Sequence, residues 1–486
     1  MPLVRARKPA AAKTVRVWED DPISTGAVPI ERPVPKLPTG RMKVTIDGAA
    51  PVAQPYDPGT PEFRYWVAAE VLKRAVSFWS PLLPKGTGWQ KGSALTVRLD
   101  AGDKVNALYN RETLTFFHAN VAGTTIYTGE SPDVVAHELG HAVLDAIRPQ
   151  LWDAMSSEVA AFHESFGDIS AILVALQLSS VRQRAIAETE GRYRSSRVSR
   201  VAEQMGWAVR QRQPCAVEPD CLRNAVNCFA YAPTAALPML APASALSSAP
   251  HSFSRVFTAA FFEAFAGMMV TLSRQPTADH LLEASQDAGR LLVAAVRGAP
   301  VVPDYYAQVA AQMIVADGVM FEGKYAAALE YGFLSRSLLS PASVTRGAQP
   351  ALAVAAMAPG PGARAAPRRS ELPTITLPGH DFGLGSRPLL VSAAGEPGRL
   401  AVASNGLDGA PSTPLSAEMA ARAFLSELVM RDRVDVPGRP PDDLGAPRSR
   451  MRTHEIVEEG EALVVVRRLF EAPATLACCG RSRRTG

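Results

Sequence analysis

The chain has 486 residues, of which 47% are hydrophobic and 20% are charged, and its formal net charge is +4. This length allows two or three domains of roughly 100–200 residues each, with a sizeable core. The small net charge and the scattered arginines exclude a concentrated basic surface, so we expect no nucleic-acid partner. The five cysteines are an odd number, which argues against a complete disulfide framework.

Residues 1–40 are rich in Pro, Lys and Arg and show no periodicity, so we expect a flexible N-terminal arm. This segment carries positive charge but lacks the apolar stretch of a secretory signal. No apolar run of about 18 residues free of charge and proline follows it, so we expect no membrane partner. The sequence therefore predicts a cytoplasmic protein, unless an unrecognised route exports it.

The structured part of the chain should begin near residue 41. Apolar residues at helical spacing predict a helix over Pro61–Trp79, and alternating apolar residues predict strands over 94–99 and 114–117. Further helices are expected over 195–212, 252–271, 277–296, 304–316 and 324–339.

Two helices in the middle of the chain carry the polar residues that matter most. The first opens with Ser-Pro-Asp at residues 131–133, which supplies an N-cap serine, a proline at the first helical position and an acid in the first turn. It should end near residue 149. The second should start at residue 156 or 157 and run towards residue 178.

The C-terminal third changes in composition. Residues 341–373 are rich in Ala, Pro, Gly and Arg and are expected to form a linker. Residues 374–486 should form a C-terminal extension with a helix over 417–431 and a hairpin over 455–470. The sequence assigns this extension no function.

The first central helix contains the motif H-E-x-x-H, from His137 through Glu138 to His141. Residues four apart share one face of a helix, so both imidazoles can reach one ion with Glu138 beside them. Zinc suits imidazole ligands, and a catalytic zinc site uses three protein ligands and a water. The alternative is a pair of histidines that merely pack or meet solvent.

A third ligand should come from the second helix, where Glu164 and Asp168 lie on one face. Glu164 would complete the metal site, and Asp168 would accept the second ring N–H of a histidine ligand and so fix its orientation. His163 is a rival ligand, although it points about 100° away from Glu164 on the helix. The alternative is that both acids are ordinary surface residues.

The segment DVVAHELGHAVLD, residues 133–145, resembles the zinc helix of the thermolysin-like zinc metallopeptidases, the gluzincin group. The segment HESFGD, residues 163–168, resembles their Glu-x-x-x-Asp element. The resemblance covers roughly residues 41–340 and implies an α+β fold. It implies an N-terminal subdomain of sheet and helix (41–155) and a mainly helical subdomain (156–340), with one catalytic zinc ion between them.

Three further short motifs match the family in the same order. Asn106-Ala107 resembles the edge-strand motif whose asparagine side chain and alanine carbonyl hold the substrate as an added strand. Leu-Arg-Asn around Arg223 resembles the element whose arginine binds a substrate carbonyl. His251, in His-Ser-Phe-Ser, resembles the histidine that stabilises the transition state. The resemblance therefore implies binding roles for Asn106, Ala107 and Arg223 and a catalytic role for His251.

Some positions depart from the family pattern. Trp152 stands where the family has a tyrosine that helps to stabilise the oxyanion, although an indole N–H can still donate one hydrogen bond. Leu246 stands where the family has the aspartate that orients its catalytic histidine. Asp133 matches a calcium ligand, but Ala175 replaces a second expected acid, so we expect no calcium site.

The activity implied by the resemblance is zinc-dependent hydrolysis of peptides or proteins, with Glu138 as general base and with His251 and Trp152 at the oxyanion. One alternative is a catalytically weak, zinc-binding pseudoenzyme that acts as a protein-binding module, suggested by Trp152 and Leu246. Another is an aminopeptidase of the wider zinc group. No feature of the sequence predicts an oligomeric state.

Overall fold

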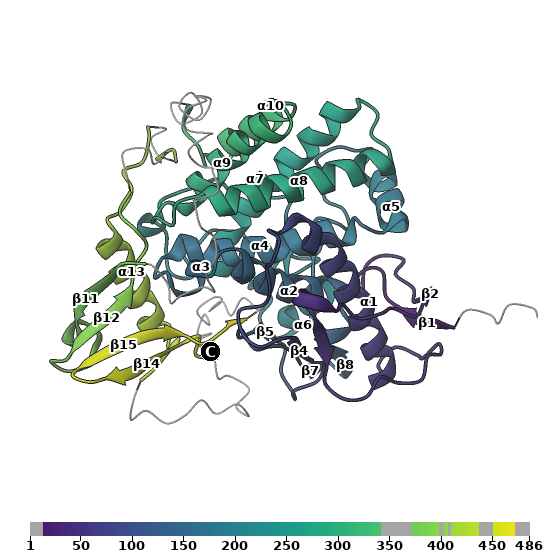
Figure 1. The fold of residues 1–486 in the computed structure, drawn as a ribbon, viewed down its shortest axis with the longest axis horizontal. Helices are drawn as coiled ribbons and strands as arrows, with labels where there is room; N and C mark the ends of the chain where they lie inside the picture. Colours follow the sequence, from purple (N-terminus) through teal and green to yellow (C-terminus); the bar gives the residue numbers. More distant parts are fainter. Residues whose placement is uncertain are drawn as a thin grey trace, which may run out of the picture.

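The computed structural model describes residues 13–341, 372–397, 402, 404–406, 410–436 and 451–471. Figure 1 shows a molecule that mixes helices and sheets, and the expected α+β class is confirmed at that level. Purple and blue strands of the N-terminal part lie on one side, teal and green helices cover the top, and a yellow-green sheet forms the far left edge.

A five-stranded sheet, in the order β16-β5-β6-β4-β3, belongs to the N-terminal part, except for β16, which comes from the C-terminal end. The strands are β3 (Val44–Ile46), β4 (Leu95–Arg98), β5 (Ala107–Tyr109), β6 (Thr113–Phe116) and β16 (Phe470–Glu471). The strands predicted over 94–99 and 114–117 correspond to β4 and β6. β16 pairs with β5 in antiparallel register, with Phe470 opposite Tyr109 and Glu471 opposite Leu108.

Helix α1 (Pro61–Trp79) has the predicted bounds, because Thr60 caps its first turn by accepting a hydrogen bond from the N–H of Phe63. The N-terminal part also contains the hairpin β7 (His118–Val121) and β8 (Thr124–Tyr127). The described residues also include short 3-10 turns: η1 (Gly40–Met42), η2 (Ser80–Leu82), η3 (Thr128–Glu130), η4 (Thr234–Ala236) and η5 (Gly379–Phe382).

The expectation of a flexible arm over residues 1–40 is wrong for residues 13–40. Strands β1 (Thr14–Val17) and β2 (Ile30–Pro33) form a hairpin. Val15 and Val17 are fully buried, and the ring of Trp18 meets Phe63 of α1 edge-on at 6.0 Å. Packing against α1 orders this segment, and local composition could not reveal that. Residues 1–12 lie outside the described chain.

Helices α2 (Pro132–Ile147) and α4 (Ser157–Ala175) cross at very short range because glycines face each other. A Cβ atom on Gly140 would lie 2.7 Å from the Cβ of Ser170, and one on Gly167 would lie 2.6 Å from the ring of His137. No larger side chain fits at either place. The glycines therefore let α4 bring its carboxylates up to the imidazoles of α2.

The remaining helices of this part are α3 (Gln150–Asp153), α5 (Ser179–Thr189), α6 (Glu203–Arg212), α7 (Pro250–Leu272), α8 (Ala278–Gly298), α9 (Tyr305–Met320) and α10 (Ala326–Ser335). Of these, α3, α7, α8 and α9 pack against α4. α7 is long and apolar enough to cross a membrane, but 72% of its most apolar window is buried in the protein. Burial against α4 and α10 is typical of a core helix.

The helix predicted over 195–212 is wrong in its first half. Residues Arg200–Val201 form strand β9, which pairs with β10 (Arg223–Asn224), and helix α6 starts only at Glu203. Ala202 between them has a left-handed backbone (φ 55°), and its N–H donates to the carboxylate of Asp133 at 3.0 Å. A tertiary hydrogen bond therefore sets the start of this helix.

The C-terminal extension forms a second, smaller layered unit with its own apolar core. Its sheet has the order β11-β12-β15-β14-β13, and helix α13 (Ala417–Met430) packs on it. The strands are β11 (Thr374–Pro378), β12 (Pro388–Ser392), β13 (Val434–Asp435), β14 (His454–Glu459) and β15 (Ala462–Arg467). The predicted helix and hairpin are both present, whereas most of the predicted linker, residues 342–371, lies outside the described chain.

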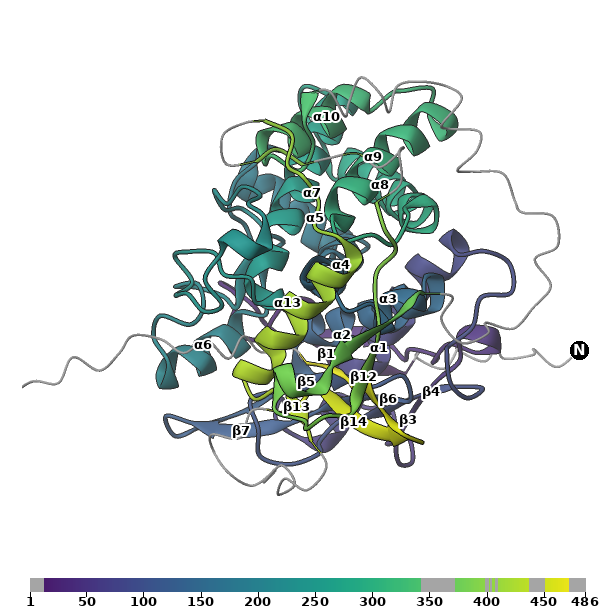
Figure 2. The ribbon, with the colours of Figure 1, turned by 90° about the vertical axis from the view of Figure 1, so that its left-hand side faces the viewer.

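Met155 and Ala160, next to and within α4, belong to this second core, so the extension packs directly on the helical part. Figure 2 looks onto this side of the molecule, with α13 and the sheet in front of α4. After β15 the chain runs back towards β5, as the yellow segment in Figure 1 shows, and ends its described part as β16.

Candidate metal centre

Two imidazoles and one carboxylate meet where α2 crosses α4. Nε2 of His137 lies 3.5 Å from Oε2 of Glu164, and Nε2 of His141 lies 3.8 Å from Oε1 of the same residue. The two imidazole rings are nearly perpendicular, with centroids 4.7 Å apart. The structure therefore brings together the three ligands expected from the sequence, all of them buried.

The buried nitrogen and oxygen atoms that face one another at this crossing have the chemistry of a cation site. Nε2 of His137, Nε2 of His141 and both carboxylate oxygens of Glu138 are buried without a hydrogen-bond partner, whereas Oε2 of Glu164 has ion-pair contacts with His137 and His251. Each such atom costs about 1–3 kcal/mol when it is left unpaired. Ligand atoms of His137, Glu138 and His141 lie within 4.8 Å of one another, so this buried group could hold a metal ion.

Charged contacts that run from His137 through Asp168 to Arg223 fix the orientation of the His137 ring. Its Nδ1 lies 3.0 Å from Oδ1 of Asp168, whose two oxygens accept hydrogen bonds from Nη2 and Nε of Arg223, both at 2.8 Å. Burial alone would raise the pKa of Asp168, but Arg223 and His137 lower it to about 2. The carboxylate is therefore charged at neutral pH and holds the imidazole with Nε2 towards Glu164.

Arg223, which the family resemblance assigns to a substrate carbonyl, is thus committed in part to Asp168. It lies in β10, which pairs with β9, and its side chain is almost wholly buried against Asp168 of α4. Its bidentate geometry with Asp168 is the strong form of a carboxylate–guanidinium pair. This contact gives Arg223 a positioning role that the sequence did not predict.

Glu138 lies at the base of the site, fully buried. Burial raises the pKa of its carboxyl group to about 8, and the neighbouring His137 opposes that rise. A carboxyl group whose pKa lies close to neutral pH can both take up a proton and return it.

His163, the rival ligand, lies on the other side of His141. Its Nδ1 is 3.4 Å from Nδ1 of His141, whereas the Nε2 atom of His141 faces Glu164. His163 therefore meets the ring nitrogen that points away from the other ligands. Its own ring stacks on Phe470 with centroids 4.0 Å apart.

His251 opens α7 and reaches the site from a third direction. Its Nε2 lies 3.1 Å from Oε2 of Glu164 and 2.6 Å from the main-chain carbonyl oxygen of Glu471. A ring N–H donated to a carbonyl here has the geometry expected of a group that binds a peptide oxygen. The contact with Glu471 was missed by the sequence prediction.

Trp152 is near the site, but its indole N–H already donates a hydrogen bond within the protein. The indole N–H donates to the carbonyl oxygen of Arg467 at 3.2 Å, and Arg467 returns a hydrogen bond from Nε to the carbonyl of Trp152 at 2.9 Å. The ring itself meets Phe470 edge-on. Trp152 cannot donate to an oxyanion while this bond to Arg467 is made.

Asn106 and Ala107 stand at the start of β5, as the edge-strand motif requires. Oδ1 of Asn106 accepts the N–H of Ala107 at 2.8 Å, and its Nδ2 donates to the carboxylate of Glu471 at 3.2 Å. The edge of β5 is paired with β16. The place expected for a substrate strand is therefore filled by the chain itself.

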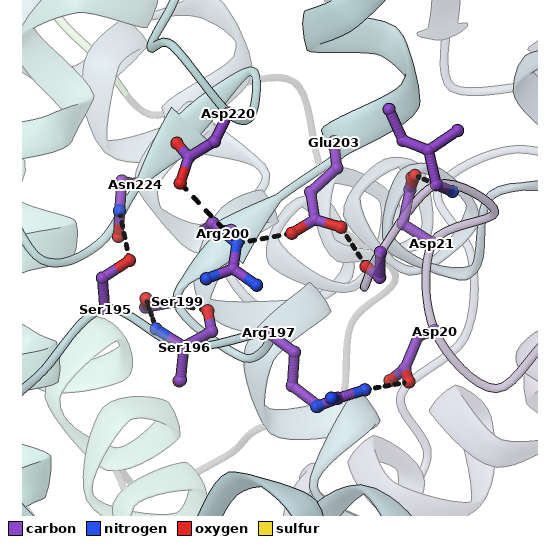
Figure 3. Close-up of polar contacts among 12 residues, drawn as sticks. Asp20, Asp21, Ser195, Ser196, Arg197, Ser199, Arg200, Glu203, Asp220 and Asn224 are labelled. Atoms are coloured by element: carbon purple, nitrogen blue, oxygen red, sulfur yellow. Dashed lines mark hydrogen bonds and ion pairs between the residues drawn. The ribbon is translucent and has the colours of Figure 1, made fainter. Parts of the chain in front are cut away.

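Asp20, Asp21 and Glu203 gather near the start of α2, where protein donors meet them (Figure 3). Asp21 accepts from the hydroxyl of Ser131 at 2.6 Å, and Arg200 lies 2.5 Å from Glu203. Asp20 pairs with Arg197 at 2.8 Å, as the dashed lines of Figure 3 show. Here the N-terminal hairpin region is tied to the helix that carries the histidines.

No family model matches the chain, and no curated protein sequence matches it.

Proposed function

We propose that the protein is a zinc-dependent metalloendopeptidase with a thermolysin-like arrangement of its two catalytic subdomains. The observation that carries this proposal is the convergence of His137, His141 and Glu164, whose facing nitrogen and oxygen atoms are buried within 4 Å of one another. Two imidazoles and one carboxylate are a known ligand set for catalytic zinc. The position of the site, between a part rich in strands and a helical part, supports the same layout.

Bound zinc would supply Lewis-acid polarisation of the peptide carbonyl and make water more acidic. Glu138, beside the ligands, would take a proton from the attacking water and pass it to the leaving nitrogen. His251 would donate from Nε2 to the developing oxyanion, a contact worth about 3–4 kcal/mol in comparable sites. Asp168 and Arg223 would hold His137 in place throughout.

The substrate would bind as an added strand on β5. Asn106 and Ala107 lie at the start of that strand, and His251 lies opposite them across β16. Main-chain hydrogen bonds along a sheet edge hold an extended peptide without regard to its sequence. An extended peptide held along β5 in this way would be cut within its chain, as an endopeptidase requires.

The second candidate is a zinc-binding protein of weak or no catalytic activity. It is favoured by the engaged indole N–H of Trp152 and by the pairing of β5 with β16. One experiment separates the two. Zinc content and hydrolysis of an N-terminally blocked, internally quenched peptide are measured in the same preparation.

A metallopeptidase should hold zinc and cut the blocked peptide, and a chelator should abolish the cleavage. Tight zinc without any cleavage, also after release of the C-terminal strand, would favour the binding protein. Cleavage only of peptides with a free N-terminus would favour an aminopeptidase. A preparation without metal affinity would contradict all three.

A further inference from the structure

The C-terminal strand β16 makes contacts that a bound peptide would need. Its pairing with β5 covers the sheet edge, and Leu469 before it packs with Leu108 and Phe117. The segment thus satisfies the backbone of β5 and covers an apolar patch beside it. An edge strand left open would be a template for any extended chain.

Phe470 fills the space against the histidines. Its ring stacks on His163 at 4.0 Å and on His141 at 5.0 Å, and meets Trp152 edge-on at 5.3 Å between centroids. The side chain is almost wholly buried. Truncation of an aromatic residue so enclosed to alanine should therefore weaken the anchoring of the segment.

Glu471 lies between Asn106, at the start of β5, and His251 of α7, the two residues that we take as the sides of a peptide-binding groove. Its main-chain carbonyl accepts from Nε2 of His251 at 2.6 Å, and its carboxylate accepts from Nδ2 of Asn106 at 3.2 Å. The carboxylate also forms an ion pair with Arg433, which lies between α13 and β13 of the extension. His251, assigned to the oxyanion, and Asn106, assigned to the substrate backbone, are thus both occupied.

Among the described residues, the cavity beside β16 leaves little room for another peptide. The cavity that Glu164, His251, Phe470 and Glu471 line together with residues of the extension has a volume of about 40 Å³. Since a water molecule needs about 10–15 Å³ on this scale, the cavity holds a few waters but no amino-acid residue.

We propose that residues 469–471 act as an inhibitor in cis, occupying the peptide-binding groove until the C-terminal extension moves. The inference rests on the proposed function, because it takes β5 and His251 as the substrate site. Arg433 and Met451 of the extension both contact the groove residues, through Glu471 and Asn106 respectively. A displacement of the extension would therefore withdraw β16 and open the groove.

Peptide binding, rather than turnover, tests this inference. The probe is a fluorescein-labelled synthetic peptide with the sequence of residues 467–473, RRLFEAP, and the readout is fluorescence anisotropy of chelator-treated, full-length protein. Phe470→Ala removes the anchor in the groove, and Arg433→Ala loosens β16 without changing a residue of β5, α2 or α4. Arg387→Ala, whose side chain pairs with Glu458 in the extension, is the matched control.

We expect both variants to bind the probe at least about tenfold more tightly than the wild type, because the open fraction no longer limits binding. Arg387→Ala should bind it as the wild type does. Circular dichroism melts show whether each variant is folded, and Arg433→Ala keeps the test valid if Phe470→Ala unfolds. Equal affinity of wild type and a folded variant would overturn the inference.

The same proteins loaded with zinc separate this inference from the proposed function. Tighter probe binding without hydrolysis by any variant would leave cis occupancy standing and contradict the peptidase. Equal probe affinity with hydrolysis by the wild type would contradict cis occupancy and leave the peptidase standing. Release of residues 472–486 from the zinc-loaded wild type, seen by intact mass, would show that the strand is a substrate and not an inhibitor.

Discussion

Nε2 of His251 lies 2.6 Å from the main-chain carbonyl oxygen of Glu471, a residue 220 positions away in the chain. The same nitrogen is 3.1 Å from Glu164, so the carbonyl is held directly beside the proposed metal ligands. A peptide carbonyl delivered to this point by an added strand is the arrangement that hydrolysis of a peptide would require.

Replacing Glu138 by glutamine should remove hydrolysis and spare the metal. The amide keeps the size of the side chain but cannot take a proton from water, and loss of a general base typically lowers kcat by about 10²–10⁴-fold. Zinc content and turnover of a blocked peptide are measured together, with Phe470→Ala as the background if the wild type is inhibited. Unchanged turnover would exclude Glu138 as the base.

Replacing Asp168 by asparagine should weaken metal binding. The carboxylate charge that faces Nδ1 of His137 at 3.0 Å is lost, and such outer contacts usually account for about 10–100-fold in metal affinity. Competition with a chromophoric chelator measures the zinc dissociation constant. Asp57→Asn, an exposed acid in a surface ion pair, serves as control and should leave that constant unchanged.

Replacing Gly167 by alanine should destabilise the fold and distort the site. The new methyl group would lie 2.6 Å from the His137 ring, and overpacking of this kind costs about 1–3 kcal/mol. Gly318 is the matched control, because it lies in helix α9 with nothing within 4 Å of its Cβ position. Gly318→Ala should instead stabilise by about 0.5–1 kcal/mol. Thermal melts of both variants decide the matter, and equal melting temperatures would contradict close contact between α2 and α4.

The free energy of unfolding should fall as the pH rises from about 5 to 8, because of Glu158. Burial and the nearby Asp304 raise the pKa of this carboxyl group to about 8, while hydrogen bonds from Tyr231 and the N–H of Tyr306 oppose the rise. The folded state therefore holds a proton that the unfolded chain releases above its ordinary pKa of 4.5. The contribution of this proton to stability is fully present below pH 4.5 and is lost as the pH rises towards 8.

The Glu158→Gln variant should flatten this dependence, since the amide cannot ionise. At about 1.4 kcal/mol per pKa unit, the wild type should lose on the order of 2–4 kcal/mol over this range relative to the variant. Urea unfolding at several pH values measures the difference. Glu459→Gln, at an exposed position of β14, should follow the wild type. A parallel pH profile for Glu158→Gln and the wild type would contradict the assignment.

Local chemistry made much of the site predictable. The start of α2 follows from Ser131, whose side chain accepts the N–H of Val134, and from the proline and acid after it. The spacing of His137 and His141, and of Glu164 and Asp168, places each pair on one helix face. The packing of α2 on α4, and the approach of Arg223 from β10 and of His251 from α7, had to be supplied by the fold.

The features that were missed depend on contacts between distant segments. β16 has two residues, and its partner β5 precedes it by more than 350 positions, so no periodicity could reveal the pairing. The hairpin of β1 and β2 is held by burial of Val15 and Val17 against α1. The delayed start of α6 depends on the hydrogen bond between Ala202 and Asp133. In each case the deciding partner is set by the tertiary structure.

Metal content of the purified wild type and of Glu164→Ala, measured side by side by mass spectrometry after incubation with zinc and gel filtration, tests the metal centre most directly. The shared site predicts one zinc ion bound to each wild-type chain and its loss from the variant, with both proteins folded. Equal zinc content in the two proteins, or none in either, would contradict a site built from α2 and α4.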